Sequence, residues 1–319
     1  MNNTIKSTCI LMLAAMIWGF AFVAQRSGME HVGPFFFNGV RTVLGALTLV
    51  AVLLARGGAK RGVGAVAAPE TEGRADGFWN DERKALLKGG FLCGLVLFAG
   101  SNFQQIGLVF TTASKAGFIT TLYIVLVPIF GIFLKHRTRW NAWAGVVLAA
   151  AGLYCLCITE RFSIAPGDLI VLLGAGFWAV HIFVIDRFVR HTGAIRLSCV
   201  QFAVCGALSL AVMPFADPHF ATASAFGLES VRAVLPAILY TGVLSSGAGF
   251  TLQAVGQKYA KPTAASIILS TEAIFGVVGG FLLLGERFTG REVLGCILMF
   301  AAVILAQLPL ASSEDSPGR

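Results

Sequence analysis

The chain has 319 residues, of which 56% are hydrophobic and only 13% charged, and its formal net charge is +8. Soluble domains carry about 25% charged residues, so the composition excludes an ordinary soluble protein and indicates an integral membrane protein. The basic residues lie in short segments beside apolar runs, which favours a role in membrane orientation over binding of nucleic acid.

Apolar runs long enough to cross a ~30 Å hydrocarbon core follow one another along the chain. They predict an all-α fold with ten transmembrane helices, at approximately 8–25, 34–55, 86–108, 113–134, 140–158, 167–186, 195–215, 233–256, 263–284 and 291–308. The long polar segment 56–84 is predicted to form a cytoplasmic loop, and 309–319 a cytoplasmic tail.

The distribution of Lys and Arg predicts the orientation of these helices. If the N-terminus is inside, 17 of the 24 basic residues fall on the inner side and six on the outer side, while Arg41 lies within a span. Because inner loops are enriched in Lys and Arg, both termini are expected in the cytoplasm. The expected location is the inner membrane of the cell, crossed many times.

The two halves of the chain are similar to each other in sequence. Four matches occur in the same order: "LAAMIW" 13–18 with "LGAGFW" 173–178, "GALTL" 45–49 with "GALSL" 206–210, "QQIG" 104–107 with "QAVG" 253–256, and Gly145 with Gly295. The repeats are predicted at 8–158 and 167–308, with five spans each. An odd number of spans makes them an inverted repeat, a plan that many secondary transporters share.

Three stretches make the chain similar to a known family: "MIWGFAFV" 16–23, the segment 102–134 that contains "NFQQIGLVF", and the segment 250–295 that contains "STEAIFGVVGGF". On these the chain resembles the EamA-type transporters of the drug/metabolite transporter superfamily. The resemblance implies ten spans in two repeats, a small-molecule substrate and no cofactor.

One departure from the family pattern concerns span 263–284. The family often has proline where this chain has Ala273, although the first half keeps Pro128. Without proline the usual cause of a kink is absent from this span. Flexibility is then expected from Gly276, Gly279 and Gly280.

Glu272 lies in the middle of that span, where an ionisable group costs roughly 2.5–3.5 kcal/mol on insertion scales and is therefore expected to have a partner or a function. It is interpreted either as a proton-binding or amine-binding carboxylate or as a structural carboxylate paired with another span. Tyr123 lies at the equivalent position of the first half, at an offset of 149 residues. The two side chains are therefore expected at similar depths on opposite walls of a central site.

Two further ionisable groups are candidates. Arg41 lies inside span 34–55 and either holds a substrate carboxylate, extends toward the membrane surface, or forms an ion pair within the bundle. His181 lies one helical turn after Trp178 and is either a hydrogen-bonded packing residue or a proton relay.

Uncharged side chains complete the candidate site. Trp18 and Trp178 are related by the repeat and lie in mid-span, where anchoring at the interface does not explain them, so they are expected to line a central cavity. Gln104 and Gln253 are also related by the repeat, and are interpreted either as substrate ligands or as hydrogen bonds between helices.

The sequence predicts a secondary transporter that exports a small organic metabolite, amino-acid-like or drug-like, by alternating access, with proton coupling as a hypothesis. A facilitative or uptake carrier is the alternative, followed by a receptor or structural protein without flux. No enzyme is predicted, because the sequence has no Walker A, HExxH or similar constellation, and no metal site is expected. The expected partners are the lipid bilayer and a small substrate but no nucleic acid, and both a monomer and a homodimer are compatible with the sequence.

Overall fold

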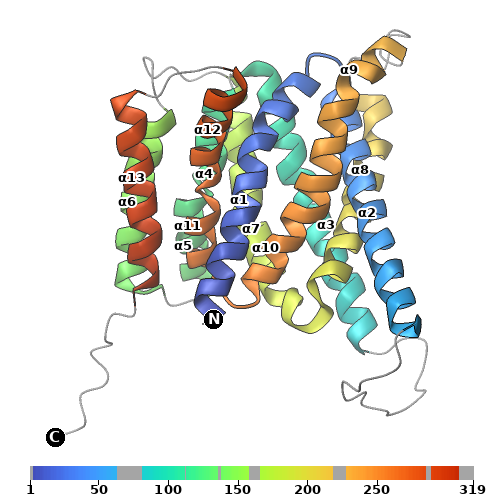
Figure 1. Cartoon of the computed structure of the whole chain (residues 1–319), viewed down its shortest axis with the longest axis horizontal. Helices are drawn as coiled ribbons and strands as arrows, with labels where there is room; N and C mark the ends of the chain where they lie inside the picture. Colours follow the sequence, from blue (N-terminus) through green and yellow to red (C-terminus); the bar gives the residue numbers. More distant parts are fainter. Residues whose placement is uncertain are drawn as a thin grey trace, which may run out of the picture.

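The computed structural model is a bundle of helices that run up and down through a single layer of similar thickness (Figure 1). It describes residues 3–62, 81–111, 113–135, 138–157, 166–217, 228–284 and 289–308, and none of these residues is in a β-strand. The predicted tail 309–319 and most of the predicted loop 56–84 lie outside the described residues.

The helices of the first half are α1 (Asn3–Gly28), α2 (Pro34–Gly62), α3 (Asp81–Phe110), α4 (Ala113–Thr121), α5 (Tyr123–Phe133) and α6 (Trp140–Cys157). Those of the second half are α7 (Pro166–Thr192), α8 (Ala194–Ala216), α9 (Leu228–Leu239), the π-helix η3 (Tyr240–Gly249), α10 (Phe250–Gln257), α11 (Pro262–Leu269), α12 (Glu272–Leu284) and α13 (Gly290–Gln307).

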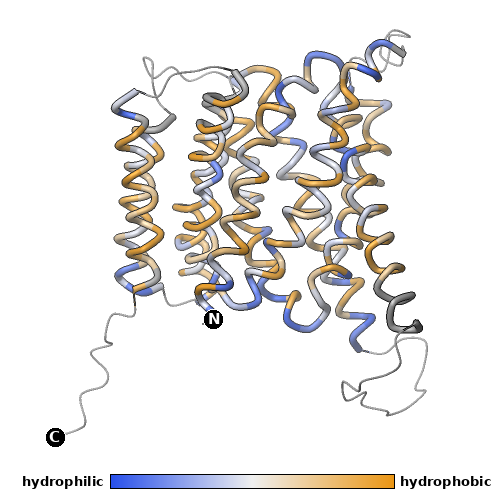
Figure 2. Tube along the Cα trace, viewed as in Figure 1, coloured by the Kyte–Doolittle hydropathy of each residue, from blue (hydrophilic) through white to orange (hydrophobic). Residues whose placement is uncertain are grey.

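The helices are apolar along their middle and hydrophilic near both ends of the bundle (Figure 2). Among the described residues, seven segments are long and apolar enough to cross a membrane: Asn3–Gly28, Pro34–Ala55, Asp81–Phe110, Ala116–Phe133, Pro166–Thr192, Ala194–Ala216 and Glu229–Gln257. The chain is therefore a multi-pass integral membrane protein.

This count of seven is smaller than the predicted ten because three predicted spans take other forms. Spans 140–158 and 291–308 contain shorter apolar helices, Trp140–Cys155 and Val293–Ala306. Span 263–284 is divided between α11 and α12, which follow each other through the bundle (Figure 1).

The main helix contacts join the two halves of the sequence. α3 packs along α7, α2 along α8, α6 along α13, and α1 along α12. Neither half therefore forms a separate body, and a site at the centre of the bundle receives side chains from both.

Close approach between α1 and α12 depends on Gly19. A Cβ atom added at Gly19 would lie 2.5 Å from the backbone oxygen of Glu272 and 2.7 Å from the backbone nitrogen of Gly276. Small residues at such crossings allow membrane helices to pack closely, and here the neighbouring atoms belong to the backbone and cannot rotate away.

We predict that Gly19→Ala destabilises the protein by about 1–3 kcal/mol, because α1 and α12 must separate to accept the methyl group. The measurement is the thermal unfolding of the purified variant in detergent. Gly176→Ala is the matched control, since a Cβ at Gly176 meets nothing within 4 Å. An unchanged melting temperature for Gly19→Ala would contradict the packing described for this crossing.

Candidate functional site

The first component of the site is the interruption between α4 and α5. The backbone N–H of Leu122 donates to the Ile119 oxygen at 3.2 Å, so the chain makes a tighter turn there than in an α-helix. Pro128 follows within α5, where it removes one further backbone donor. The helix therefore restarts at Tyr123.

The second component is the interruption between α11 and α12, and it forms without proline. The Ser270 hydroxyl donates to the Ile267 oxygen at 2.7 Å, and the Thr271 hydroxyl donates to the Ile268 oxygen at 2.6 Å. Side-chain hydroxyls that bond the preceding turn compete with the helical backbone bonds. The interruption thus lies before the position where the family often has proline, and α12 runs through Gly276, Gly279 and Gly280 without a break. Flexibility at these glycines stays a prediction.

The two interruptions bring Tyr123 and Glu272 together. The Tyr123 hydroxyl donates a hydrogen bond to Oε1 of Glu272 at 3.2 Å, and both residues are buried. Tyr123 is the first residue of α5 and Glu272 the first residue of α12. The hydrogen bond therefore joins the first turns of the two helices that follow the interruptions.

A central cavity with an empty volume of about 530 Å³ lies beside this pair. Its lining comes from both halves of the chain: Trp18, Phe22, Gln25, Arg41, Gln104, Thr120, Tyr123, Trp178, Ile182, Ser245, Phe250, Gln253, Leu269 and Glu272. A mostly apolar lining with a few polar and charged side chains is typical of sites for small organic molecules. Seven of the eight predicted site residues line it, and the exception is His181.

Aromatic rings form one wall of the cavity. The ring centroid of Phe250 lies 4.7 Å from that of Trp18 and 5.9 Å from that of Trp178, so the two tryptophans related by the repeat are joined by one phenylalanine. The indole N–H of Trp18 donates to the Ser245 oxygen at 3.2 Å. This carbonyl belongs to η3, and π-helical segments frequently mark functional sites.

The amide residues related by the repeat have different surroundings. Nε2 of Gln104 donates to Oγ1 of Thr120 at 3.1 Å, which ties α3 to α4. Oε1 of Gln253 is buried without a hydrogen-bond partner among the described residues. Gln253 therefore retains an acceptor for a ligand donor, whereas the Gln104 amide N–H₂ already bonds a neighbouring helix.

Comparison with known proteins agrees with this architecture. The profile of the EamA-like transporter family matches residues 5–158 and again 165–308. The chain belongs to the EamA-like transporter family.

Several relatives of this EamA-like transporter are named as transporters. An uncharacterized transporter of Archaeoglobus fulgidus is 30% identical over 299 residues, which cover 93% of this chain and 84% of the relative. The uncharacterized transporter YoaV of Bacillus subtilis is 23% identical, with 91% and 92% covered. A chloroplastic WAT1-related protein of Arabidopsis thaliana is 23% identical, with 97% and 71% covered.

A solved crystal structure has the same fold. It superposes with a TM-score of 0.71 at 20% sequence identity and covers 95% of this chain and 96% of the other. At this identity the superposition shows a shared fold, and the predicted resemblance to EamA-type transporters is confirmed by the family profile.

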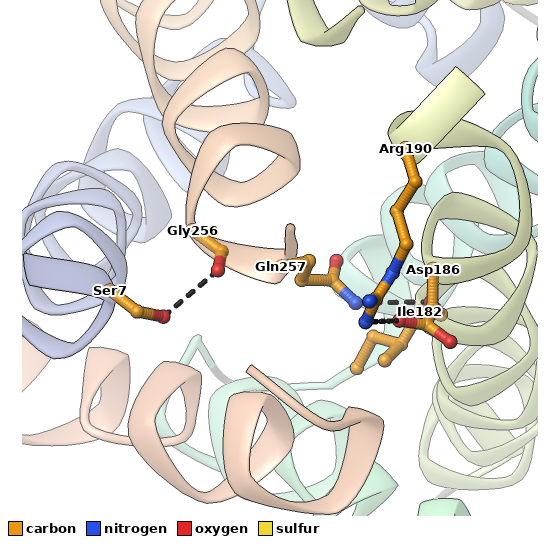
Figure 3. Close-up of polar contacts among 6 residues, drawn as sticks. All are labelled: Ser7, Ile182, Asp186, Arg190, Gly256 and Gln257. Atoms are coloured by element: carbon orange, nitrogen blue, oxygen red, sulfur yellow. Dashed lines mark hydrogen bonds and ion pairs between the residues drawn. The ribbon is translucent and has the colours of Figure 1, made fainter. Parts of the chain in front are cut away.

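Hydrogen bonds join helices α1, α10 and α7 of the EamA-like protein toward the end of the bundle that holds the N-terminus (Figures 1 and 3). The Ser7 hydroxyl of α1 donates to the Gly256 oxygen of α10 at 2.9 Å. Nε2 of the next residue, Gln257, donates to the Ile182 oxygen of α7 at 3.0 Å. α10 thus bridges α1 and α7 just below the cavity.

His181 is buried beside the cavity and does not line it. One of its ring nitrogens, Nε2, lies 2.9 Å from Oε1 of Gln201 in α8. Its ring meets the rings of Trp178 and Phe250 edge-on, each at a centroid distance of 5.9 Å. This geometry fits a packing residue that supports the aromatic wall.

Sequence reasoning missed half of the lining: Phe22, Gln25, Thr120, Ile182, Ser245, Phe250 and Leu269. Phe22 and Phe250 are two among 26 phenylalanines, and nothing in the pattern distinguishes them. Gln25 had a detectable signal, because it lies two helical turns after Trp18 and so falls near the same face of α1.

We predict energetic coupling between Tyr123 and Glu272. Tyr123→Phe and Glu272→Met each remove one partner of a buried hydrogen bond, so the double variant should lose less stability than the sum of the single losses, by about 1 kcal/mol. Thermal unfolding of the four proteins measures this difference. Tyr154→Phe with Glu272→Met is the control pair and should be additive, since the Tyr154 ring lies instead against Arg291. Additive losses for Tyr123 and Glu272 would contradict a stabilising bond.

Proposed function

We propose that this protein is a secondary transporter that exports a small organic metabolite by alternating access. The observation that carries the proposal is the central cavity, which lies where two interrupted helices meet and is lined by both halves of the chain. Interrupted helices around a site at mid-membrane are the usual arrangement of secondary transporters with repeated folds.

We further propose ten crossings built from two inverted repeats of five. In support, each contact between helices has a counterpart in which every helix is replaced by its equivalent in the other half. The contact of α1 with α12 has its counterpart in the contacts of α7 with α4 and α5. The contact of α3 with α7 has its counterpart in the contacts of η3 and α10 with α1. α2 with α8 and α6 with α13 each correspond to themselves. This is the pattern expected of a pseudo-two-fold axis in the membrane plane.

The orientation rests on charge. The excess of Lys and Arg supports placing both termini, and the contacts of Ser7 and Gln257, on the cytoplasmic side of an inner membrane. We propose that the hydrogen bonds of Ser7 and Gln257 to backbone oxygens restrict access to the cavity from the cytoplasm. Breaking them allows α1 and α7 to separate from α10, which opens the cavity to the cytoplasm.

Glu272 is the proposed coupling group. Among the described residues that line the cavity, the ionisable side chains are Glu272, Tyr123 and Arg41. Protonation of Glu272 weakens its hold on the Tyr123 hydroxyl, because a charged acceptor makes the stronger hydrogen bond. Since that bond joins α5 to α12, a proton on Glu272 loosens the contact between the two interrupted helices and favours their rearrangement.

Two alternatives predict different behaviour. A facilitative or uptake carrier moves its substrate down a gradient and does not need a titrating group at position 272. A receptor or structural protein binds without flux. The paired contacts between the halves favour a transporter over a receptor or a structural protein, because alternating access requires two equivalent packings of the helices.

We predict that cells expressing the wild type enrich specific metabolites in the medium and that Glu272→Gln reduces this enrichment to the level of an empty membrane. Gln keeps the shape and an acceptor but cannot exchange a proton. Untargeted mass spectrometry of the medium, at equal membrane abundance of each protein, measures the effect.

Glu82→Gln is the matched control, because Glu82 is exposed at the start of α3 and pairs with Arg196 at 3.0 Å. It should export as the wild type does. Equal export by Glu272→Gln would contradict the coupling role. No enrichment by the wild type in any growth condition would contradict export itself.

A further inference from the structure

Arg41 is a buried cation in the interior of a membrane protein. It lies seven residues after Pro34, the first residue of α2, so it is roughly 10 Å along the helix. Its exposed fraction is 4%. Arginine keeps its proton in proteins, so the guanidinium cannot avoid the cost of burial by becoming neutral. Such a charge requires compensation by an anion or by hydrogen bonds.

A polar network holds this guanidinium in place from one side. Nε of Arg41 donates to Oδ1 of Asn38 at 2.8 Å, and Nδ2 of Asn38 donates to the Ser101 oxygen at 3.0 Å and to Oδ1 of Asn102 at 3.1 Å. Nδ2 of Asn102 in turn donates to the Ser209 hydroxyl at 3.0 Å. Helices α2, α3 and α8 together therefore orient Arg41.

The other side of the guanidinium has no counterion. Within the part of the chain that the structure describes, no Asp or Glu lies within 4.0 Å of Arg41, and its two terminal nitrogens have no hydrogen-bond acceptor. Arg41 lines the central cavity. The two terminal N–H₂ groups form the planar fork that binds a carboxylate through two parallel bonds.

The acidic group that lines the cavity, unlike Arg41, is bonded to an ionisable side chain. Glu272 is the one acidic side chain among the described lining residues, and it already accepts a hydrogen bond from Tyr123. Within the described part of the chain, the cation is therefore the group left without a counterion, and its protein contacts are the Asn38 side chain and the Phe37 ring, whose centroid lies 5.8 Å from Cζ of Arg41. The same cavity is lined by the aromatic rings of Trp18, Phe22, Trp178 and Phe250, which suit a flat apolar body.

Building on the proposed transport function, we propose that the substrate is a small organic monocarboxylate with a flat, apolar body, and that its carboxylate binds the Arg41 guanidinium. One cation next to one carboxylate favours a single negative charge, so a phosphate dianion fits less well than a carboxylate. A cationic amine without an acidic group would leave Arg41 unpaired and add a second positive charge.

The test is a binding measurement on the purified full chain in lipid nanodiscs with four matched probes: 3-phenylpropanoate, 3-phenylpropanamide, 3-phenylpropylamine and 2-phenylethyl phosphate. The carboxylate should bind at least about tenfold more tightly than the other three, as expected for a charge-assisted pair of hydrogen bonds. Equal or tighter binding of the amide or the amine overturns the proposal, and so does binding of none of the four. Preference for the phosphate shows that the anion site takes a different group and overturns the carboxylate assignment.

Variants of Arg41 provide the second arm. Arg41→Gln should raise the Kd for 3-phenylpropanoate about tenfold or more while leaving the Kd for the amide unchanged, and Arg41→Lys should have an intermediate effect because it keeps the charge but loses the fork. Arg190→Gln, at the exposed end of α7, is the charge-matched control. Unchanged carboxylate binding in a folded Arg41→Gln overturns the assignment. Carboxylate binding without flux would instead contradict the transport function and leave the anion site in place.

Discussion

Every backbone polar group inside a bilayer must find a hydrogen-bond partner, and this constraint determines where the helices of this protein can be interrupted. Exposed to lipid, the freed groups at Leu122 or at Ser270 and Thr271 would each cost several kcal/mol. Both interruptions lie inside the bundle, where tight turns and the Ser270 and Thr271 hydroxyls satisfy part of the backbone. The central cavity exists because these two irregular segments meet there.

The Tyr123–Glu272 hydrogen bond connects the two interruptions, and the rest of the site is arranged around it. The aromatic wall built on Phe250 gives the cavity an apolar surface, and Arg41 adds a positive charge to the lining. In the proposed mechanism, protonation of this pair changes the contact between the interrupted helices, while Arg41 binds the substrate carboxylate. This division lets binding and rearrangement be controlled by different side chains within one cavity.

Sequence patterns predicted the membrane class, the family and half of the cavity lining, because residues such as Trp18, Trp178, Arg41 and Glu272 are conspicuous against apolar surroundings. The offset of 149 residues also singled out Tyr123 and Glu272 as a pair, although it placed them on opposite walls, whereas the structure joins them by a hydrogen bond. The patterns could not locate the interruption at Ser270 and Thr271, because the same residues are common inside ordinary helices and their hydroxyl bonds depend on neighbouring spans. The patterns also could not show that Phe250 lines the cavity or that His181 does not. Both positions depend on how side chains from distant helices pack together.

The central claim is that the cavity is a transport path reached from both sides of the membrane in turn. Ser245 lines it and is 2% exposed, and Ser245→Cys in a background without other cysteines changes only one atom. The most direct measurement is labelling of this cysteine by a membrane-impermeant maleimide, applied to the outside of whole cells and to inside-out vesicles. The account predicts labelling from both sides, slowed in each case by transported substrate. Labelling from one side only, or from neither while transport proceeds, would contradict it.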